Sequence, residues 1–281
     1  MRFLIVFMLS VSNYLLNAQE TKLNVMVIFA HPDEGEIYAG GTTALYTQMG
    51  HNVKFLSITN GDAGHYSMKP KPLAKRRFKE AMNAKEILKL SDYQVLDHHD
   101  GNLKNTIEIQ KEVANIIDKW KADIVFTFYP AEGGHNDNMT AGYIVRDAVK
   151  YLKQKDLPVF IYMRDFHTTS FSYIPDFAVI IDDVWEQKLA GLAAHESQVI
   201  EANPYALGIL EEMKASKKRQ QEYLYSNAYP FSKPTFDNRK SLEKWYGINR
   251  AKSAKYVEAF EIAEFGKQVN NSEIKRLFPI K

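Results

Sequence analysis

One imidazole and two carboxylates lie within four residues of one another at His31-Pro32-Asp33-Glu34. Such a group can supply two metal ligands and a general base. It directly follows the apolar run 25–30, which is predicted to be a buried strand of a parallel sheet. Open α/β sheets bind their ligands at the carboxyl ends of such strands. The alternative is an ordinary turn in which Asp33 and Glu34 cap the next helix.

Three more predicted strands are also followed by acids, imidazoles or glycines. These segments are 60–64 (NGDAG), 97–101 (DHHDG) and 134–138 (GHNDN). Because parallel strands place their carboxyl ends along one edge of the sheet, the four loops can converge over one crevice. Four matching strand ends therefore favour a functional site over four unrelated turns.

Short apolar runs alternate with amphipathic helical patterns along much of the chain. Strands are predicted at 23–30, 53–59, 93–97, 123–129, 158–163 and 177–182. Helical spacing places apolar residues on one face at Val113, Ile116, Ile117 and Trp120, and again at Val145, Ala148, Val149 and Leu152. The alternation predicts an α/β, Rossmann-like fold with a mainly parallel sheet flanked by helices. Residues 184–226 are predicted to be largely helical, with Trp185, Leu189 and Leu192 on one face.

Two glycine pairs could in principle cradle a phosphate group. Gly40-Gly41 falls about two turns beyond the first strand, whereas a dinucleotide fingerprint needs its glycines in the strand-to-helix turn. We therefore expect this pair to allow close packing of the first helix. Gly133-Gly134 follows the fourth predicted strand, where a flexible loop explains it better. The sequence contains neither a Walker pattern nor G-x-G-x-x-G.

Composition narrows the possible partners and ligands. The 281 residues include 36 Lys plus Arg and 34 Asp plus Glu, a net charge of +2 that gives no electrostatic footprint for nucleic acid. The absence of cysteine excludes disulfides and thiolate metal sites. Histidine, carboxylate and amide groups are the metal ligands that remain.

The first eighteen residues have the parts of a secretory signal peptide: Arg2, an apolar stretch over 3–11, and Ala18 before the expected cleavage. We therefore predict export, to the periplasm or outside the cell. The apolar stretch is too short for a comfortable membrane span, so none is expected in the mature chain. An uncleaved leader would instead act as a membrane anchor. Residues 19–281 are predicted to form a single domain, with a core over about 22–226 and a helical and irregular C-terminal elaboration over about 227–281.

These strings resemble the LmbE/PIG-L superfamily, zinc-dependent de-N-acetylases that act on N-acetylglucosaminyl conjugates. Residues 30–34 (AHPDE) are similar to its AHPDD motif, and residues 135–138 (HNDN) fall where the family has H-x-D-H. Further similarities lie at residues 59–64, at Arg77 with Glu80, and at 100–103, 195–198 and 256–260. The resemblance implies an LmbE-like fold and a hydrolase that removes an N-acetyl group from a small amino-sugar (GlcNAc-type) conjugate or glycoconjugate. With the leader predicted at residues 1–18, the enzyme is expected to be exported.

The resemblance also implies a role for each matching position. His31, Glu34 and Asn138 would be the metal ligands. A divalent ion, zinc in the family, would polarise the amide and activate water. Asp33 would be the general base. His135 would stabilise the oxyanion and protonate the leaving amine, Asp137 would orient that imidazole, and Arg77 and Asp100 would bind sugar or phosphate groups of the substrate.

Two departures from the family pattern fall on the metal ligands. Glu34 stands where the family has Asp, and Asn138 stands where it has His. An amide oxygen is a weak, hard donor that suits Mg, Mn or Ca better than zinc, so we expect zinc to be held more loosely. His98, His99 or His167 could complete the site instead. By contrast, His51 is predicted on the opposite edge of the sheet, and His195 is expected to be structural.

Three interpretations of function follow from the sequence. The first is the metal-dependent N-deacetylase. The second is a family member that has weakened or lost catalysis and binds a glycan or a partner. Retention of Asp33, His135 and Asp137 argues against the second, because a binding module needs neither a base nor an acid. The third is a hydrolase of another amide or ester, since specificity resides in loops such as 64–74 and 165–176.

Overall fold

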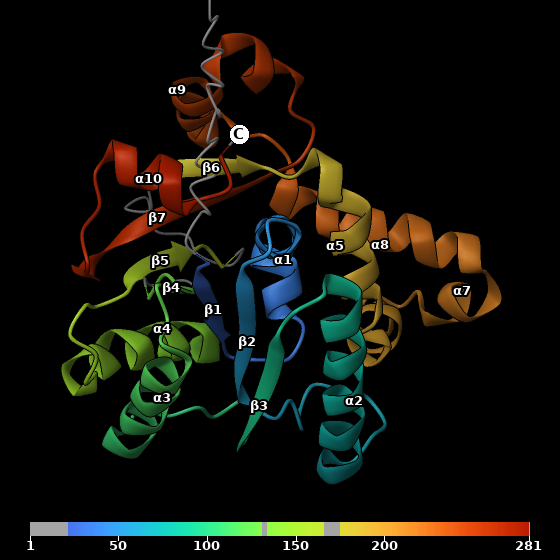
Figure 1. Cartoon of the computed structure of the whole chain (residues 1–281). Coiled ribbons are helices and arrows are strands. Elements are labelled where there is room, and N and C mark those ends of the chain that lie inside the picture. The colour runs from blue at the N-terminus through green and yellow to red at the C-terminus, as the bar shows by residue number, and fades with distance from the viewer. Residues whose placement is uncertain (1–21, 131–133, 166–174, 281) are drawn as a thin grey trace, which may run out of the picture.

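The computed structural model describes residues 22–130, 134–165 and 175–280 (Figure 1). Its sheet has seven strands in the order β3-β2-β1-β4-β5-β7-β6. Five neighbouring strands pair in parallel: β1 (Asn24–Phe29), β2 (Asn52–Thr59), β3 (Asp92–His98), β4 (Ile124–Phe128) and β5 (Val159–Met163). The predicted α/β fold with a mainly parallel sheet is confirmed.

The C-terminal strand β7 (Val257–Gly266) was not predicted. It lies between β5 and β6 (Phe177–Ile180) and pairs antiparallel with both. Its sequence VEAFEIAEFG is rich in Glu and Ala, which are depleted in strands. Pairing on both edges, together with burial of residues such as Phe260, outweighs that local preference. The expectation of a helical and irregular C-terminal part is corrected by this strand.

Helices cover both faces of the sheet. On one side α1 (Glu34–Gln48), α2 (Pro70–Leu88) and α5 (Trp185–Ala193) pack together, and on the other α3 (Ile107–Trp120) packs on α4 (Asn136–Ala148) (Figure 1). The expected apolar faces point inward: Trp185, Leu189 and Leu192 are buried in α5. Short 3-10 turns follow α4 at Val149–Tyr151 and precede α5 at Asp182–Val184.

The predicted helical stretch after α5 is divided into several pieces. A π-helix (Ser197–Ala202) leads into α6 (Asn203–Ala206), α7 (Leu210–Ala215) and α8 (Lys217–Ser232). Next come α9 (Phe236–Ser253), which is kinked at Gly247 and packs on β6, and α10 (Asn271–Leu277) beside β7 (Figure 1). π-Helical turns occur frequently at functional sites, and Gln198 of this one lines a cavity.

Close packing holds α1 in position. A Cβ added to Gly41 would lie 2.7 Å from Ile181 Cδ1, just after β6, so the expected tight packing of the Gly40-Gly41 pair is confirmed. A buried ion pair reaches the same stretch of α1, with Lys188 Nζ 2.6 Å from Glu258 Oε1. Glu258 accepts the N–H groups of Gly41 and Thr42, and Lys188 donates to Ile37 O. Residues of α5 and β7 are thereby bonded to the helix that begins at Glu34.

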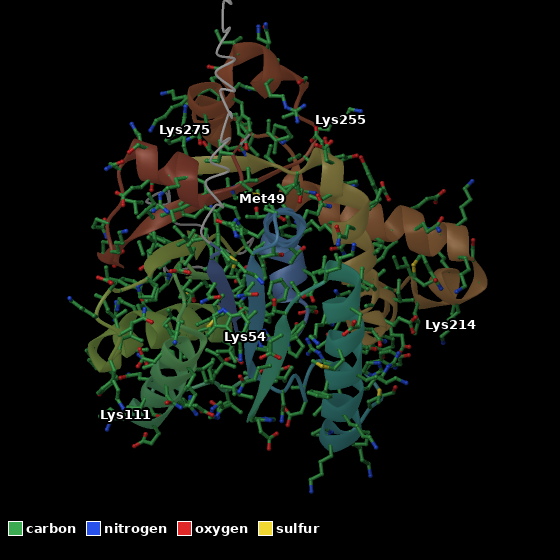
Figure 2. All side chains as sticks on the ribbon, viewed as in Figure 1. Met49, Lys54, Lys111, Lys214, Lys255 and Lys275 are labelled. Carbon is green, nitrogen blue, oxygen red and sulfur yellow. The ribbon has the colours of Figure 1, made fainter. Side chains whose placement is uncertain are left out.

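Exposed basic side chains are spread over separate elements. Lys111, Lys214, Lys255 and Lys275 lie on different sides of the molecule in Figure 2. No helix in the described part of the chain is long and apolar enough to cross a membrane. Residues 1–18, predicted to be a leader, lie outside the described residues, so export stays a prediction from the sequence.

Candidate functional site

A cavity of about 210 Å³ lies at the carboxyl ends of the parallel strands. Its walls are His31, Asp33, Glu34, Ile37, Tyr38, Gly64, Arg77, Asp100, His135, Asn138 and Gln198. All four polar loops contribute to it, so their predicted convergence is confirmed. From β1 the chain adds β2 and β3 on one side of the sheet and β4 and β5 on the other. The direction of strand addition therefore reverses between β1 and β4, and open α/β sheets bind ligands in the crevice at such a switch point.

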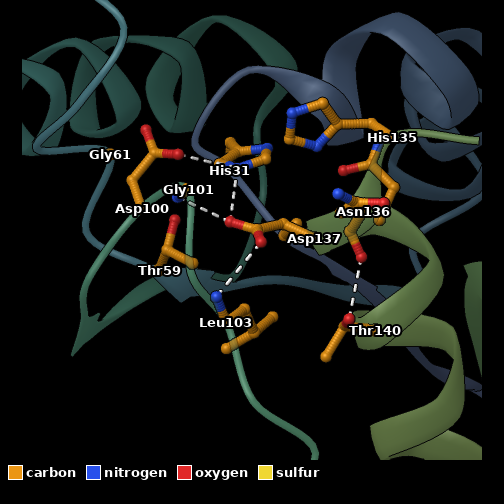
Figure 3. A network of polar contacts seen from close by, with 12 residues as sticks. His31, Thr59, Gly61, Asp100, Gly101, Leu103, His135, Asn136, Asp137 and Thr140 are labelled. Atoms are coloured by element: carbon orange, nitrogen blue, oxygen red, sulfur yellow. Dashed lines mark hydrogen bonds and ion pairs between the residues drawn. The ribbon is translucent and has the colours of Figure 1, made fainter.

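The His31 imidazole is bonded on both sides. Its Nδ1 lies 3.0 Å from Glu34 Oε1, while its Nε2 lies 2.9 Å from Asp100 Oδ1 and 3.3 Å from Asp137 Oδ2 (Figure 3). Burial disfavours the charged ring, but Glu34, Asp100 and Asp137 outweigh that effect and raise the pKa of His31 well above its usual value. The ring therefore lies in a strongly anionic environment.

Asp33 has an unusual backbone and a perturbed carboxyl group. Its φ of 123° is a strained conformation for a residue with a Cβ, and such strain occurs preferentially at functional sites. Arg77 supports this turn by donating from Nη2 to Pro32 O at 2.7 Å. Burial raises the pKa of Asp33 to about 7, against the opposing effect of the Arg77 guanidinium 3.5 Å away. A carboxyl group that titrates near neutral pH is suited to general-base work.

Arg77 and Asp100 both line the cavity, as their predicted role in binding substrate requires. Several of their hydrogen-bonding groups are nevertheless bonded to other residues of the protein. Arg77 Nη1 donates to Gly61 O and to Asp100 Oδ2, each at 3.3 Å, and the Arg77 side chain is only 3% exposed. Their contact with sugar or phosphate groups stays a prediction, whereas the bonds of Asp100 to His31 and of Arg77 to Pro32 are present in the structure.

His135 is the N-cap residue of α4, and its ring centroid lies 5.1 Å from that of His31. Asp137, two residues later, accepts from Gly101 N at 2.7 Å and Leu103 N at 3.1 Å, in addition to its contact with His31 (Figure 3). The structure thus places Asp137 against His31, whereas the family resemblance assigned it to the His135 imidazole.

Asn138 is 3% exposed and lines the cavity. Its Nδ2 donates to Asp165 Oδ2 at 2.9 Å, while its Oδ1 is buried with no hydrogen-bond partner among the described residues. Asp165, just after β5, was not among the predicted site residues. The same signal that marked the other strand ends, an acid directly after an apolar run, was present there in Arg164-Asp165.

The other histidines in the described part of the chain have partners away from the cavity. His98 contacts Glu112 at 2.8 Å and His99 contacts Asp62 at 2.8 Å, so neither completes the ligand set. His195 is fully buried with Nε2 3.1 Å from Glu36 Oε1, and its charge also acts on the Asp33 carboxyl group, so its structural role stays a prediction. His51 accepts from Leu23 N at the amino end of the sheet. His167 lies outside the described residues.

Gln198 lines the cavity, although the sequence assigned it no role. It lies in the π-helix that follows α5, next to Ser197. Ser197 donates through its N–H (2.9 Å) and its Oγ (2.6 Å) to the two oxygens of Glu80 on α2. Glu80 and the segment 195–198, two of the segments that resemble the family, are therefore in contact with each other. This contact holds Gln198 beside the cavity.

The donor set fits a divalent cation. Four carboxylates (Asp33, Glu34, Asp100 and Asp137) and one guanidinium (Arg77) are buried at this site. A bound cation could replace the proton of His31 as the counter-charge of this cluster. Ligand atoms of His31, Asp100 and Asp137 lie within 4.8 Å of one another. The expected set of His31, Glu34 and Asn138 shares His31 with that cluster. His31 Nδ1 faces Glu34, which belongs to the expected ligand set, while Asp100 and Asp137 hold Nε2. Nδ1 is therefore the nitrogen that could bind the ion, with carboxylates on the other nitrogen as is usual around metal-bound histidine.

Known proteins are similar to this chain in sequence and in fold. The family model "PIG-L: GlcNAc-PI de-N-acetylase" matches residues 26–149. The diacetylchitobiose deacetylase of Thermococcus kodakarensis is 33% identical over 186 residues, which cover 62% of this chain and 69% of that protein. The chain belongs to the PIG-L family. The residues matched by the family model include His31, Asp33 and His135 of the cavity.

Solved structures show how widely the fold of this PIG-L family member is used. The N,N'-diacetylchitobiose deacetylase of Pyrococcus horikoshii aligns with a TM-score of 0.64 at 21% identity, over 85% of this chain and 83% of that one. The 4-carboxy-2-hydroxymuconate hydratase GalB of Pseudomonas putida aligns with a TM-score of 0.65 at 19% identity, over 88% and 98%. One fold thus carries a deacetylase and a hydratase, so the reaction has to be argued from the site.

Proposed function

We propose that this protein is a metal-dependent hydrolase that removes the N-acetyl group of an N-acetylglucosamine-type amino sugar. The observation that supports it best is one cavity that brings together Asp33 on its strained turn, the His135 imidazole and the anionic cluster around His31. The matched family is named for GlcNAc-PI and the relative for diacetylchitobiose. These two substrates share the acetamido sugar and differ in what it is joined to, which places the common chemistry at the acetamido group.

The residues of the cavity divide the work of amide hydrolysis among them. His31, Glu34 and Asn138 would hold the divalent ion, which when bound polarises the acetamido carbonyl and lowers the pKa of the attacking water. Asp33 would accept the proton of that water. His135 would hydrogen-bond the developing oxyanion and then protonate the leaving amine.

The supporting residues fix those groups in place. Asp100 and Asp137 hold the His31 ring, and Arg77 holds the turn that carries Asp33. Zinc is the metal implied by the family resemblance. The glutamate and amide ligands are also compatible with Mg, Mn or Ca, which accept oxygen donors more readily.

Acetate release tests the proposal directly. The purified protein should contain a stoichiometric divalent metal and release acetate from N,N'-diacetylchitobiose. Chelation should abolish the reaction, because the amide carbonyl is then no longer polarised, and metal readdition should restore it. Elemental analysis and enzymatic acetate determination measure the two quantities. Unchanged release after complete metal removal would refute the metal-dependent mechanism, and glycan binding without metal or release would identify a non-catalytic family member.

Asn138→His should raise zinc affinity by at least about tenfold, or 1.4 kcal/mol. The replacement exchanges an amide oxygen for an imidazole nitrogen, which zinc prefers. Competition with a chromophoric chelator gives the dissociation constants of the two proteins. Equal constants would place residue 138 outside the ligands.

A further inference from the structure

The Asn138 side chain is held from one side only. Its Nδ2 donates to Asp165 Oδ2 at 2.9 Å, and its Oδ1 is buried without a hydrogen-bond partner among the described residues. A buried amide oxygen without a partner is unfavourable, because it has lost its hydrogen bonds to water. Asn138 lines the anionic cavity, so a cation bound there could satisfy this oxygen.

The orientation of the Asn138 amide follows from the chemistry of its neighbour. An ionised carboxylate accepts hydrogen bonds and donates none, so an amide facing it must present its NH₂ group. Flipping the amide would bring Oδ1 against Asp165 Oδ2, with two acceptors in contact. Asp165 therefore selects the one amide orientation that leaves Oδ1 on the side away from itself.

Asp165 is itself rigidly held. It is fully buried just after β5, and the same Oδ2 accepts the His135 N–H at 2.8 Å while its Oδ1 accepts from the Tyr38 hydroxyl at 3.2 Å. His135 and Asn138 lie at the start of α4, and Tyr38 lies on α1. One carboxylate thus connects the elements on the two sides of the cavity.

We propose that Asp165 is a positioning residue for metal binding, because it holds the Asn138 amide with Oδ1 available to the ion. The proposal rests on the function proposed above, in which Asn138 is a ligand. It assigns to this amide the kind of carboxylate partner that metal-bound histidines usually have. Loss of such a partner lowers metal affinity by about 10–100-fold.

A double-mutant cycle on metal affinity tests this coupling. Zinc and manganese are titrated separately into the metal-free wild type, Asp165→Ala, Asn138→Ala and the double variant. Asp165→Ala should weaken binding about 10–100-fold. In the Asn138→Ala background the same change should cost less than about twofold, because the ligand through which Asp165 acts is absent. An undiminished effect in that background would overturn the proposal.

Two further variants separate orientation from folding and charge. Asp165→Asn keeps an acceptor oxygen for the Asn138 NH₂ group, so its metal affinity should stay within about threefold of wild type; a loss as large as that of Asp165→Ala would refute the orienting role. Asp147→Ala is the control, because it removes another aspartate that accepts from an asparagine (Asn105 Nδ2 to Asp147 Oδ2, 2.7 Å). Asp147 lies at the other end of α4 from Asn138 and is not part of the cavity wall.

The metal titrations distinguish failure of the role proposed for Asp165 from failure of the proposed function. If wild-type protein binds neither zinc nor manganese, the metal site itself is wrong and the proposed function fails with it. If wild type binds metal and the cycle shows no coupling, only the role of Asp165 fails. Melting temperatures of the metal-free proteins show whether each variant is folded, and they do not enter the coupling.

Discussion

Asp33→Asn should lower the rate of acetate release by about 10²–10⁴-fold, the usual contribution of a positioned general base. The amide has nearly the same shape as the carboxyl group, but it cannot take a proton from water. Asparagine also tolerates positive φ better than most residues, so the strained turn at 123° should remain intact. Steady-state kinetics with N,N'-diacetylchitobiose measures the loss.

Metal content and melting temperature show whether the lower activity of Asp33→Asn comes from loss of the base alone. Asp33 is outside the proposed ligand set, so the variant should retain its metal. Its melting temperature should not fall, because burial already disfavours the charged carboxylate and raises its pKa to about 7. The matched control is Asp156→Asn, an exposed aspartate just before β5 at the amino ends of the strands, which should be fully active. Full activity of Asp33→Asn would assign the base to another group.

His31→Ala should remove both bound metal and activity. His31 belongs to the expected ligand set with Glu34 and Asn138 and also to the cluster with Asp100 and Asp137. Its loss should therefore weaken zinc binding more than about 100-fold, the upper range for a residue that only supports a ligand. Chelator competition and elemental analysis measure the change.

His98→Ala is the control for this second prediction. His98 was an alternative ligand, but in the structure it contacts Glu112 at 2.8 Å and is absent from the cavity wall. Its replacement should leave metal affinity unchanged. Loss of metal from His98→Ala, or retention by His31→Ala, would show that the ion binds elsewhere.

The parts predicted well from the sequence are those determined by local pattern. The run 25–30 is buried along its whole length, and its apolar residues marked β1 and the position of His31 without ambiguity. Polar residues at four consecutive strand ends predicted the cavity, because parallel topology brings those ends together. The motif around His31 also identified the family, which the comparisons confirm.

The parts that were missed depend on contacts between distant segments. The partner of Asp137 is determined by how the loop at Gly101-Leu103 folds onto it, and no local spacing encodes that fold. Asp165 carried the right signal, but its partner Asn138 lies 27 residues earlier in the chain. Strand β7 is formed by its two neighbours against its own composition, because tertiary pairing can outweigh a weak local preference.

The buried pair of Lys188 and Glu258 makes the folding of the site depend on the C-terminal strand β7. A chain shortened before β7 would keep every proposed ligand, base and acid, yet Lys188 would lose its counter-charge inside the protein. Removing one partner of a buried pair costs about 3–5 kcal/mol, a large share of the 5–15 kcal/mol that holds a typical domain folded. The family match ends at residue 149, so this dependence lies outside the matched segment. Any chimera that joins the C-terminal part of one relative to this chain must carry residues 188 and 258 together.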